Sequence, residues 1–520
     1  MTSKSLQNKP HQLLAKALAQ AKTVSREGVV KAINLDRSTK EILTAAGCLT
    51  EVIKGWYLLT SPLSQTQDQS IVWYGGCWAF LNYYLQDRFG KNGYCFSAES
   101  SMDLHAGEPT IAHQWTVLTR ETSNHVITLP QQSSLFLYSD KNNFPSEFDR
   151  KNGLNIMTLP QALTRLPPSY YTHKPLNVEL VLRSFSTISE ISRTLLETQG
   201  VTAANRIVGA YKALKESSKA SQISEDLSAA GFTVKPINPF TTYEPTLNSG
   251  LNPKSPHSGR IETLWIQMRP AVIKIFPSPP GLSKSLLKTI HTIEGIYAQD
   301  AYHSLSIEGY QVTEALIKKI VLGNWNPDDD VFDRGQKNAL AAKGYYDTFQ
   351  AVLGSIEKVF KKKQVAGDIF QDDLQNWYRK LFHPSVQVGL IKAADLVGYR
   401  NSQVYIRGSR HVPPSSHPLM DIMDTFFKLL RQETHPGVRA VLGHFIFVYI
   451  HPYMDGNGRI GRFLMNLMLI SGGYSWTILR VERHQEYMSA LEQASVHGNI
   501  LPFTRFIMSE MKFSRELAKK

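Results

Sequence analysis

HPYMDGNGRIGR, residues 451–462, is the part of this 520-residue chain that says most about its fold and its chemistry. It holds one histidine, one aspartate, three glycines and two arginines. The runs Val438–Ile450 before it and Phe463–Ile470 after it are apolar enough for buried helices, so we expect a rigid loop that opens a helix. Such a loop is suited to anions, because free backbone N–H groups and the helix dipole point at the ligand.

This stretch resembles the Fic motif, His-Pro-Phe-x-Asp/Glu-Gly-Asn-Gly/Lys-Arg-x-x-Arg, of enzymes that transfer AMP from ATP to protein hydroxyl groups. The one departure is Tyr453, which replaces the usual Phe and keeps an aromatic ring. The resemblance implies a mainly α protein, with an all-α helical bundle and a β-hairpin flap over residues 261–515. It also implies ATP and Mg²⁺ as cofactors, a protein substrate with a Ser, Thr or Tyr hydroxyl, and the activity of a protein adenylyltransferase.

The residue types in the motif suit that reaction. Nucleotidyl transfer needs a base for the hydroxyl and neutralisation of charge on the phosphates. We expect His451 to be the base, since its unperturbed pKa lets it accept a proton at neutral pH, and Asp455 to hold Mg²⁺. Arg459 and Arg462 share a helix face and can reach the β- and γ-phosphates. The remaining expected nucleotide contacts come from backbone N–H groups and from one side-chain amide, over Gly456, Asn457, Gly458, Ile460 and Gly461.

Two other interpretations of this region are a dinucleotide-binding loop and a zinc site. The glycines of residues 456–461 also satisfy the dinucleotide-binding pattern, after a run (FIFVYI) that could be a strand, and Glu482 follows at the spacing of a ribose-binding acid. However, five residues separate that run from the first glycine, and no second βαβ unit is visible. His444 shares a helix face with His451, but further zinc ligands are missing, so we expect His444 to be a packed core residue.

Two segments upstream complete the expected site. Residues 399–414, YRNSQVYIRGSRHVPP, resemble the Fic flap, a hairpin that covers the nucleotide and pairs with an extended segment of the target. Its residues nearest the ligand are expected to be Val404, Tyr405, Ile406 and Arg407. For the adenine ring, the candidates are Tyr487 for stacking and Ser495 for a polar contact.

The second upstream segment, residues 304–309 (SLSIEG), resembles the family's inhibitory motif Ser/Thr-x-x-x-Glu-Gly/Asn through Ser304, Glu308 and Gly309. Carried over, the resemblance implies that Glu308 pairs with Arg462 and blocks the productive γ-phosphate pose. We therefore expect low basal activity. A similar glutamate positions water for AMP removal in some relatives, so the reverse reaction stays open.

The N-terminal half has a different pattern. Residues 1–60 predict short helices at 11–21, 29–33 and from Asp36 to Ala46, followed by a hairpin around Lys54-Gly55, as in a winged helix that could bind DNA. A small helical subdomain is the alternative. Residues 61–237 resemble the α/β antitoxin of type IV toxin–antitoxin systems, through Ser97, Ala98, Ser101, Leu104 and His105. Residues 238–260 are rich in Pro, Ser, Asn and Gly and predict a linker.

Composition limits the remaining possibilities. The net charge of +13 favours a polyanionic partner, either nucleotide or nucleic acid. No apolar run reaches the roughly 18 residues of a membrane span, the first residues lack an apolar signal core, and three cysteines without metal spacing suit a cytoplasmic protein. Two alternatives remain open: a DNA-binding regulator whose Fic core only senses nucleotide, and a Fic enzyme that uses another nucleotide or phosphate donor.

Overall fold

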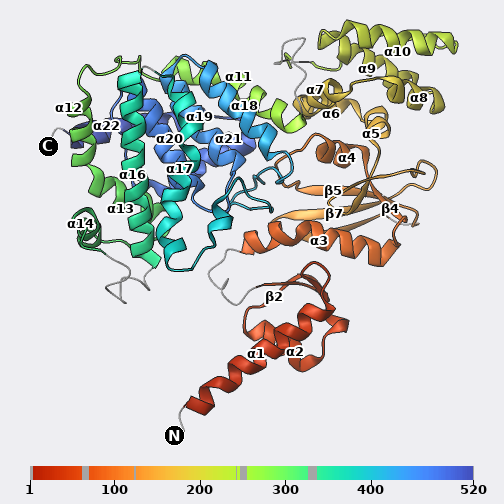
Figure 1. The fold of residues 1–520 in the computed structure, drawn as a ribbon. Coiled ribbons are helices and arrows are strands. Elements are labelled where there is room, and N and C mark those ends of the chain that lie inside the picture. The colour runs from red at the N-terminus through yellow and green to blue at the C-terminus, as the bar shows by residue number, and fades with distance from the viewer. Residues whose placement is uncertain are drawn as a thin grey trace. The chain divides into compact units, whose positions relative to one another are not determined.

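A computed structural model describes residues 4–60, 69–121, 124–241, 243–245, 255–325, 337–362 and 364–518 (Figure 1). The chain forms two compact units. The first consists of Met1–Pro256 together with Tyr405–Val412, and the second of His257–Val404 together with Pro413–Lys520. Helices dominate, and the strands of the described residues belong to three small sheets.

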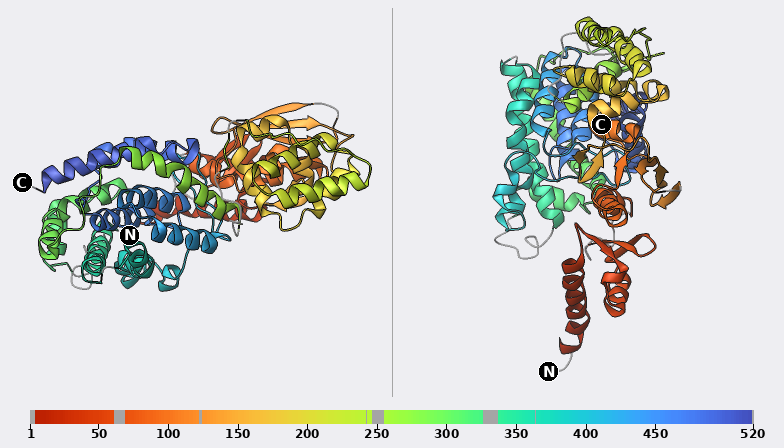
Figure 2. Two further views of the ribbon diagram at one scale, coloured as in Figure 1. Left: turned by 90° about the horizontal axis from the view of Figure 1, so that it is seen from above. Right: turned by 90° about the vertical axis from the view of Figure 1, so that its right-hand side faces the viewer.

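The first unit begins with two helices and a three-stranded sheet. Its three strands pair antiparallel in the order β1-β3-β2, and helices α1 and α2 pack against each other (Figure 2, right). Asp36 caps α2 by accepting a hydrogen bond from the Thr39 backbone N–H at 2.9 Å, as predicted, and Gly55 has φ +84° in the predicted turn. The elements are α1 (Lys4–Val24), β1 (Val29–Lys31), α2 (Arg37–Ala45), β2 (Leu49–Ile53) and β3 (Trp56–Leu59).

The predicted short helix at residues 29–33 is wrong. Val29–Lys31 is a strand that pairs with Trp56–Leu58, and only Ala32–Asn34 forms a turn of 3₁₀ helix. Val29 and Val30 are both buried. β-Branched side chains of this kind favour a strand when a pairing partner is available, and that partner lies about 27 residues further along the chain, outside the window that periodicity examines.

The rest of the first unit combines a mixed sheet with small helices. The sheet has the order β4-β5-β7-β6, and β5 and β7 are parallel. Gly209 lies where a Cβ would overlap the Ile237 carbonyl, so this close approach of the two backbones requires glycine. The elements are α3 (Gln69–Phe89), β4 (Tyr94–Phe96), α4 (Ala98–His105), β5 (Gln114–Thr119), β6 (His125–Leu129), β7 (Ser133–Ser139), β8 (Asp149–Lys151), β9 (Leu154–Ile156), α5 (Leu159–Arg165), α6 (Pro168–His173), α7 (Pro175–Ser184), α8 (Ser189–Glu197), α9 (Val201–Ala213) and α10 (Ser217–Ala229).

Residues 405–412 belong to this first unit. His411 forms an isolated antiparallel bridge with Thr110, and the Ile111 N–H donates to the Arg410 carbonyl at 3.1 Å. Tyr405 packs 3.8 Å from the position of a Cβ on Gly75. Between residues 401 and 414 the chain makes a turn but no paired strands, so the expected hairpin ladder is absent there. Pro413 and Pro414 have no N–H to donate, which prevents a ladder at that end.

The second unit is a helical bundle around α19 and α20, whose side chains are almost all buried. Packed helices α16, α17, α19 and α20 form its centre (Figure 1). Its helices are α11 (Pro256–Ile275), α12 (Leu286–Gly295), α13 (Tyr297–Ile307), α14 (Glu314–Val321), α16 (Lys337–Lys362), α17 (Ala366–Gln387), α18 (Leu419–Gln432), α19 (Pro436–Ile450), α20 (Asn457–Ser471), α21 (His484–His497) and α22 (Leu501–Leu517).

Two boundaries differ from the sequence prediction. Helix α11 begins at Pro256, so the last residues assigned to the linker are helical, while residues 242 and 246–254 lie outside the described residues. The run 445–450 is the end of helix α19 and not a strand, which removes the dinucleotide-fold alternative. Among the helices that the structure describes, none combines the length and apolarity required to cross a membrane.

Candidate active site

The loop between α19 and α20 begins with an unusual backbone conformation at His451. This residue follows the last turn of α19 with φ 53° and ψ 60°, in the left-handed region that non-glycine residues seldom adopt. Its backbone N–H still donates to the Phe447 carbonyl at 3.0 Å. The buried helix therefore ends by turning the His451 side chain out of the helix direction into the loop.

The His451 ring is held in one orientation. Nδ1 lies 3.1 Å from the Val448 carbonyl, so Nδ1 carries the proton in neutral imidazole and Nε2 is the acceptor. Burial lowers the pKa of His451, the Val448 bond raises it, and the nearby Arg400 cation lowers it, with the net shift downward. The imidazole is therefore neutral at physiological pH, as a general base must be.

The residues after His451 form a closed turn. The Asn457 Oδ1 accepts from the Tyr453 N–H at 3.0 Å, and its Nδ2 donates to the Tyr453 carbonyl at 2.8 Å. The Tyr453 ring stacks on Tyr378 with 3.7 Å between centroids. Both ends of the Asn457 amide thus hold this turn together, and the expected contact of this amide with the nucleotide remains a prediction.

Gly456 and Asp455 precede the first turn of α20. Gly456 has φ +83°, and a Cβ there would meet Phe382 at 2.9 Å, so the position requires glycine. The Asp455 side chain is 60% exposed. One carboxylate oxygen accepts from the Gly456 N–H at 2.6 Å and the other lies 3.2 Å from Nη2 of Arg459. An exposed carboxylate beside a helix N-terminus can bind a hard cation that also contacts phosphate oxygens.

The two motif arginines are buried beneath this turn. Arg459 is 1% exposed, and its guanidinium lies 5.2 Å from the ring centroids of both Tyr310 and Phe382. Arg462 is 4% exposed, and its Nε donates to the Ser304 hydroxyl at 2.8 Å. Among the described residues, Nη1 of Arg462 has no hydrogen-bond partner. Two buried cations at a helix N-terminus make a strong binding site for an anion.

Glu308 occupies part of that site. It follows the end of α13, where Gly309 adopts φ +83°, and its Oε1 lies 2.7 Å from Nη2 of Arg462. Burial alone would raise the pKa of Glu308, but Arg462 and Arg459 outweigh burial, so its pKa is lowered. Glu308 and Arg462 are 154 residues apart in sequence, and the structure brings them together as the sequence prediction requires.

One buried acid near the site escaped the sequence interpretation. Asp300, on α13, accepts hydrogen bonds from the Tyr345 hydroxyl at 2.7 Å and from the Trp476 Nε1 at 3.0 Å. Burial raises its pKa to about 6, against the opposing effect of these hydrogen bonds. Asp300 thereby fixes α13, and with it Ser304 and Glu308, against α16 and the segment after α20. In the sequence, Asp300 could have been recognised only as an acidic residue on the mostly apolar, buried face of a helix.

Of the two predicted adenine contacts, Tyr487 is buried and Ser495 is half-buried. Tyr487 is 3% exposed and packs beside Phe503 and Phe506, and its hydroxyl lies 2.8 Å from Nε2 of His444. The Ser495 hydroxyl donates to the Leu491 carbonyl of its own helix. The expected role of these two side chains at the adenine ring remains a prediction.

His444 is a packed core residue, as expected. It is fully buried, burial lowers its pKa to about 4, and Phe503 stacks on its ring. Within the described ranges, no group of three or more His, Cys, Asp or Glu side chains has the arrangement of a metal site.

The four expected flap residues divide between the two units. Val404 is buried in the second unit, where Gln403 Nε2 donates to the Pro413 carbonyl at 2.7 Å and so joins the two arms of the loop. Tyr405, Ile406 and Arg407 belong to the segment that packs in the first unit. Their expected role near the nucleotide remains a prediction.

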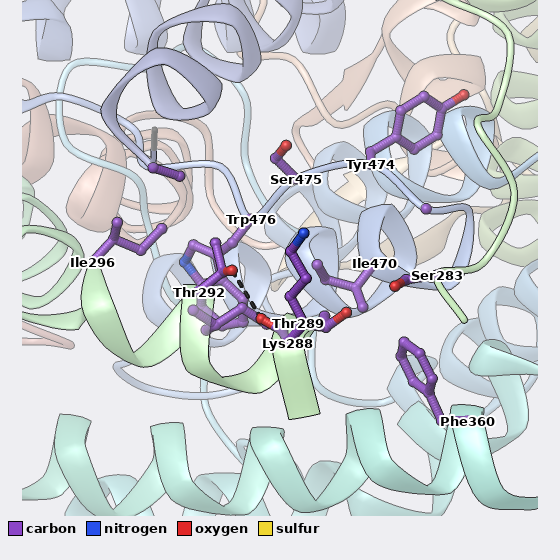
Figure 3. Close-up of a pocket in the computed structure, with 13 residues that line it drawn as sticks. Ser283, Lys288, Thr289, Thr292, Ile296, Phe360, Ile470, Tyr474, Ser475 and Trp476 are labelled. Carbon is purple, nitrogen blue, oxygen red and sulfur yellow. Dashed lines mark hydrogen bonds between the residues drawn. The ribbon is translucent and has the colours of Figure 1, made fainter. Parts of the chain in front are cut away.

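A cavity of about 260 Å³ lies elsewhere in the second unit, between α12, α16 and the end of α20 (Figure 3). It contains none of the motif residues. The hydroxyls of Thr289 and Thr292, which line it, donate to the Ser285 and Lys288 carbonyls.

Residues 368–469 match the Fic/DOC family model. The chain is 32% identical over 245 residues to "Protein adenylyltransferase Fic" of Nematostella vectensis, covering 45% of this chain and 50% of that protein. It is 31% identical over 215 residues to the protein of that name from Drosophila melanogaster, covering 41% and 40%. The chain thus spans half or less of the length of these curated relatives.

Among solved structures, Fic-1 from C. elegans aligns with a TM-score of 0.36 at 16% identity, over 69% of this chain and 90% of that one. A Fic domain protein from Bacteroides thetaiotaomicron aligns with a TM-score of 0.35 at 21% identity, over 50% and 95%. The loop with His451, Asp455 and the two arginines therefore lies in the part of the chain that matches the Fic/DOC family.

Proposed function

We propose that this protein is an adenylyltransferase that transfers AMP from ATP to a Ser, Thr or Tyr hydroxyl of a protein substrate. The observation that carries the proposal is that one loop places two features together. The first is the neutral imidazole of His451, whose Nε2 is the acceptor, and the second is the pair of buried arginines, Arg459 and Arg462, at the N-terminus of α20. The similarity to curated proteins named protein adenylyltransferase Fic supports it.

The reaction follows from these groups. His451 Nε2 takes the proton of the substrate hydroxyl, whose oxygen forms a bond to the α-phosphorus while the bond from that phosphorus to the bridging oxygen of pyrophosphate breaks. Arg459 and Arg462 neutralise the charge on the β- and γ-phosphates. The free N–H groups of the first turn of α20 hold phosphate oxygens.

Asp455 fits a requirement for Mg²⁺. Its carboxylate is exposed and lies at the mouth of the anion site, and Mg²⁺ in nucleotide enzymes is bound by one or two carboxylates and by substrate phosphates. A bound Mg²⁺ would supply further neutralisation of phosphate charge.

We further propose that Glu308 inhibits the enzyme. Its ion pair with Arg462 occupies a guanidinium that the γ-phosphate needs, and its negative charge repels phosphate. Ser304 supports the same arrangement, because its hydroxyl and its carbonyl both accept from Arg462, at 2.8 and 3.0 Å.

The test is incubation of purified Glu308→Gly protein with Mg²⁺ and α-³²P-ATP, followed by intact mass measurement. A mass increase of AMP on the protein supports transfer. An increase of UMP or phosphate in a panel of donors would identify another donor instead. If neither label nor mass increase appears on this chain or on added proteins, the transferase proposal is wrong and a nucleotide sensor remains. Loss of AMP from a premodified protein would indicate the reverse reaction.

A second candidate function, DNA binding, is favoured by the winged arrangement of residues 29–59. Helix α2 begins at the exposed Arg37, and a turn at Lys54-Gly55 joins β2 and β3 in the manner of a wing. Arg37 pairs with the exposed Glu41, which reduces the positive charge of this surface. Gel shift of mixed duplex DNA at low and high salt, with Arg37→Ala as the variant, tests this function, and absence of salt-sensitive binding removes it.

A further inference from the structure

Arg400 is an unusual buried arginine of the second unit. It is 5% exposed, and in the described part of the chain its guanidinium contacts backbone carbonyls instead of a carboxylate. Nε donates to His451 O at 2.8 Å and Nη1 to Ser402 O at 2.8 Å. Nη2 donates to the Pro414 carbonyl and lies 3.5 Å from Ile450 O.

These carbonyls belong to two segments of the second unit, the end of α19 and the base of the flap loop. Ile450 and His451 end α19, where the last carbonyls lack partners within the helix and carry partial negative charge. Ser402 and Pro414 are the two sides of the loop that resembles the flap, and Gln403 also links its sides. Arg400 therefore joins the end of the His451 helix to the base of the flap loop.

Arg400 also fixes the peptide unit beside the catalytic imidazole. Its own N–H donates to Pro452 O at 2.9 Å, while its Nε binds His451 O. The carbonyls of His451 and of Pro452 are thus both held by one residue. His451 is in the left-handed region, a conformation that persists only when surrounding contacts impose it.

From this geometry, and resting on the proposed transferase function, we propose that Arg400 is a positioning residue that holds the backbone of His451 so that Nε2 points at the substrate hydroxyl. Small displacements of a catalytic group cost large factors in rate. The end of α19 also holds His451, since the Phe447 carbonyl accepts from its backbone N–H and the Val448 carbonyl lies 3.1 Å from Nδ1 of its ring. The carbonyl of His451 is held by Arg400.

The Arg400 charge provides a second, separable effect. Burial lowers the pKa of Arg400 to about 10, so the guanidinium stays charged at neutral pH. The charged groups that act on His451 are Arg400, which lowers the imidazole pKa, and Glu308 and Asp455, which raise it. Removing Arg400 should therefore raise the pKa of His451 and move the acid limb of the rate profile to higher pH.

The experiment compares Arg400→Met and Arg400→Lys, each in the Glu308→Gly protein, by initial rates of AMP transfer over pH and ATP concentration. For Arg400→Met we expect kcat to fall by roughly 10- to 100-fold, while KM for ATP changes by less than about twofold. We also expect the acid limb of the pH–rate profile to move to higher pH. Arg400→Lys keeps the charge but loses the planar fork of donors, so kcat should fall while the acid limb stays in place.

The control is Arg439→Met, at the other end of α19, where Arg439 Nη1 lies 3.4 Å from the Glu433 carbonyl and Nη2 donates to the Ser471 hydroxyl at 3.2 Å. The positioning role is overturned if Arg400→Met has the same kcat as its parent. It is also overturned if Arg400→Met loses no more kcat than Arg439→Met when the two variants show the same fall in Tm. If the Glu308→Gly parent itself transfers no AMP, the proposed function fails instead, so the two failures are distinguishable.

Discussion

Gly458 leaves no room for a side chain next to Glu308, because a Cβ at residue 458 would overlap Oε1 of the Glu308 carboxylate. The carboxylate therefore lies directly on the first turn of α20, the place where the helix dipole and free N–H groups attract an anion. Glu308 thus lies where the start of α20 would attract an anion, and it also takes a hydrogen bond of Arg462.

Gly458→Ala is expected to lower Tm in the wild-type background, because the new methyl group must displace the Glu308–Arg462 pair. In the Glu308→Gly background the obstacle is gone, and alanine favours the helix. A double-mutant cycle by thermal unfolding should therefore give a coupling of about 1–3 kcal/mol. Gly354→Ala, in α16 with open space around it, is the control that should not destabilise. Additive effects would contradict the contact.

The stabilisation that the Glu308–Arg462 ion pair gives to the fold should depend on pH. The pKa of Glu308 is lowered below its ordinary value of 4.5, so the ionised carboxylate favours the folded state. This stabilisation is fully present above about pH 4.5 and is lost as the pH falls through the lower folded-state pKa. The difference in Tm between wild type and Glu308→Gln should be constant from pH 7 to 5 and shrink below that. A difference that grows on acidification would show the opposite shift.

His451→Ala in the Glu308→Gly background should reduce AMP transfer by roughly 10²- to 10⁴-fold, the usual contribution of a general base. ATP binding should change little, because the arginines and the start of α20 remain. Labelling rate and ATP affinity measured on the same preparation check both statements. His497→Ala, at the exposed end of α21, is the matched control. Retention of the parent rate in His451→Ala would remove the imidazole from its role.

The parts of the site that sequence reasoning anticipated are those encoded by short patterns. His451, Asp455 and the arginines lie on one loop and one helical turn, so their spacing determines their geometry. The Glu308–Arg462 contact spans 154 residues and was available only through the resemblance to an inhibitory motif.

What sequence reasoning missed depends on distant partners. Asp300 receives its hydrogen bonds from residues 45 and 176 positions away, and Arg400 binds carbonyls about 50 positions away. Backbone carbonyls belong to every residue and leave no mark in a sequence. The strand at Val29–Lys31 was misassigned as a helix for the same reason, since local propensity does not specify which partner is present.

Tyr453 is the one position where the motif departs from its usual residue, Phe. Its ring is 1% exposed and stacks on Tyr378, but its hydroxyl has no hydrogen-bond partner among the described residues. Tyr453→Phe keeps the stack and removes a buried polar group that is unpaired. The free energy of unfolding should therefore stay unchanged or rise by about 1 kcal/mol, with AMP transfer in the Glu308→Gly background unaltered.

Tyr453→Leu is the matched comparison for this residue. It removes the stack, worth about 0.5–1.5 kcal/mol beyond area burial, and loosens the turn that Asn457 closes. Tm and kcat should both fall, because His451 and the start of α20 are the two ends of that turn. Thermal unfolding and labelling of both variants decide the matter. A lower Tm in Tyr453→Phe would mean that the hydroxyl is paired, and that the extra oxygen is part of how this loop is held.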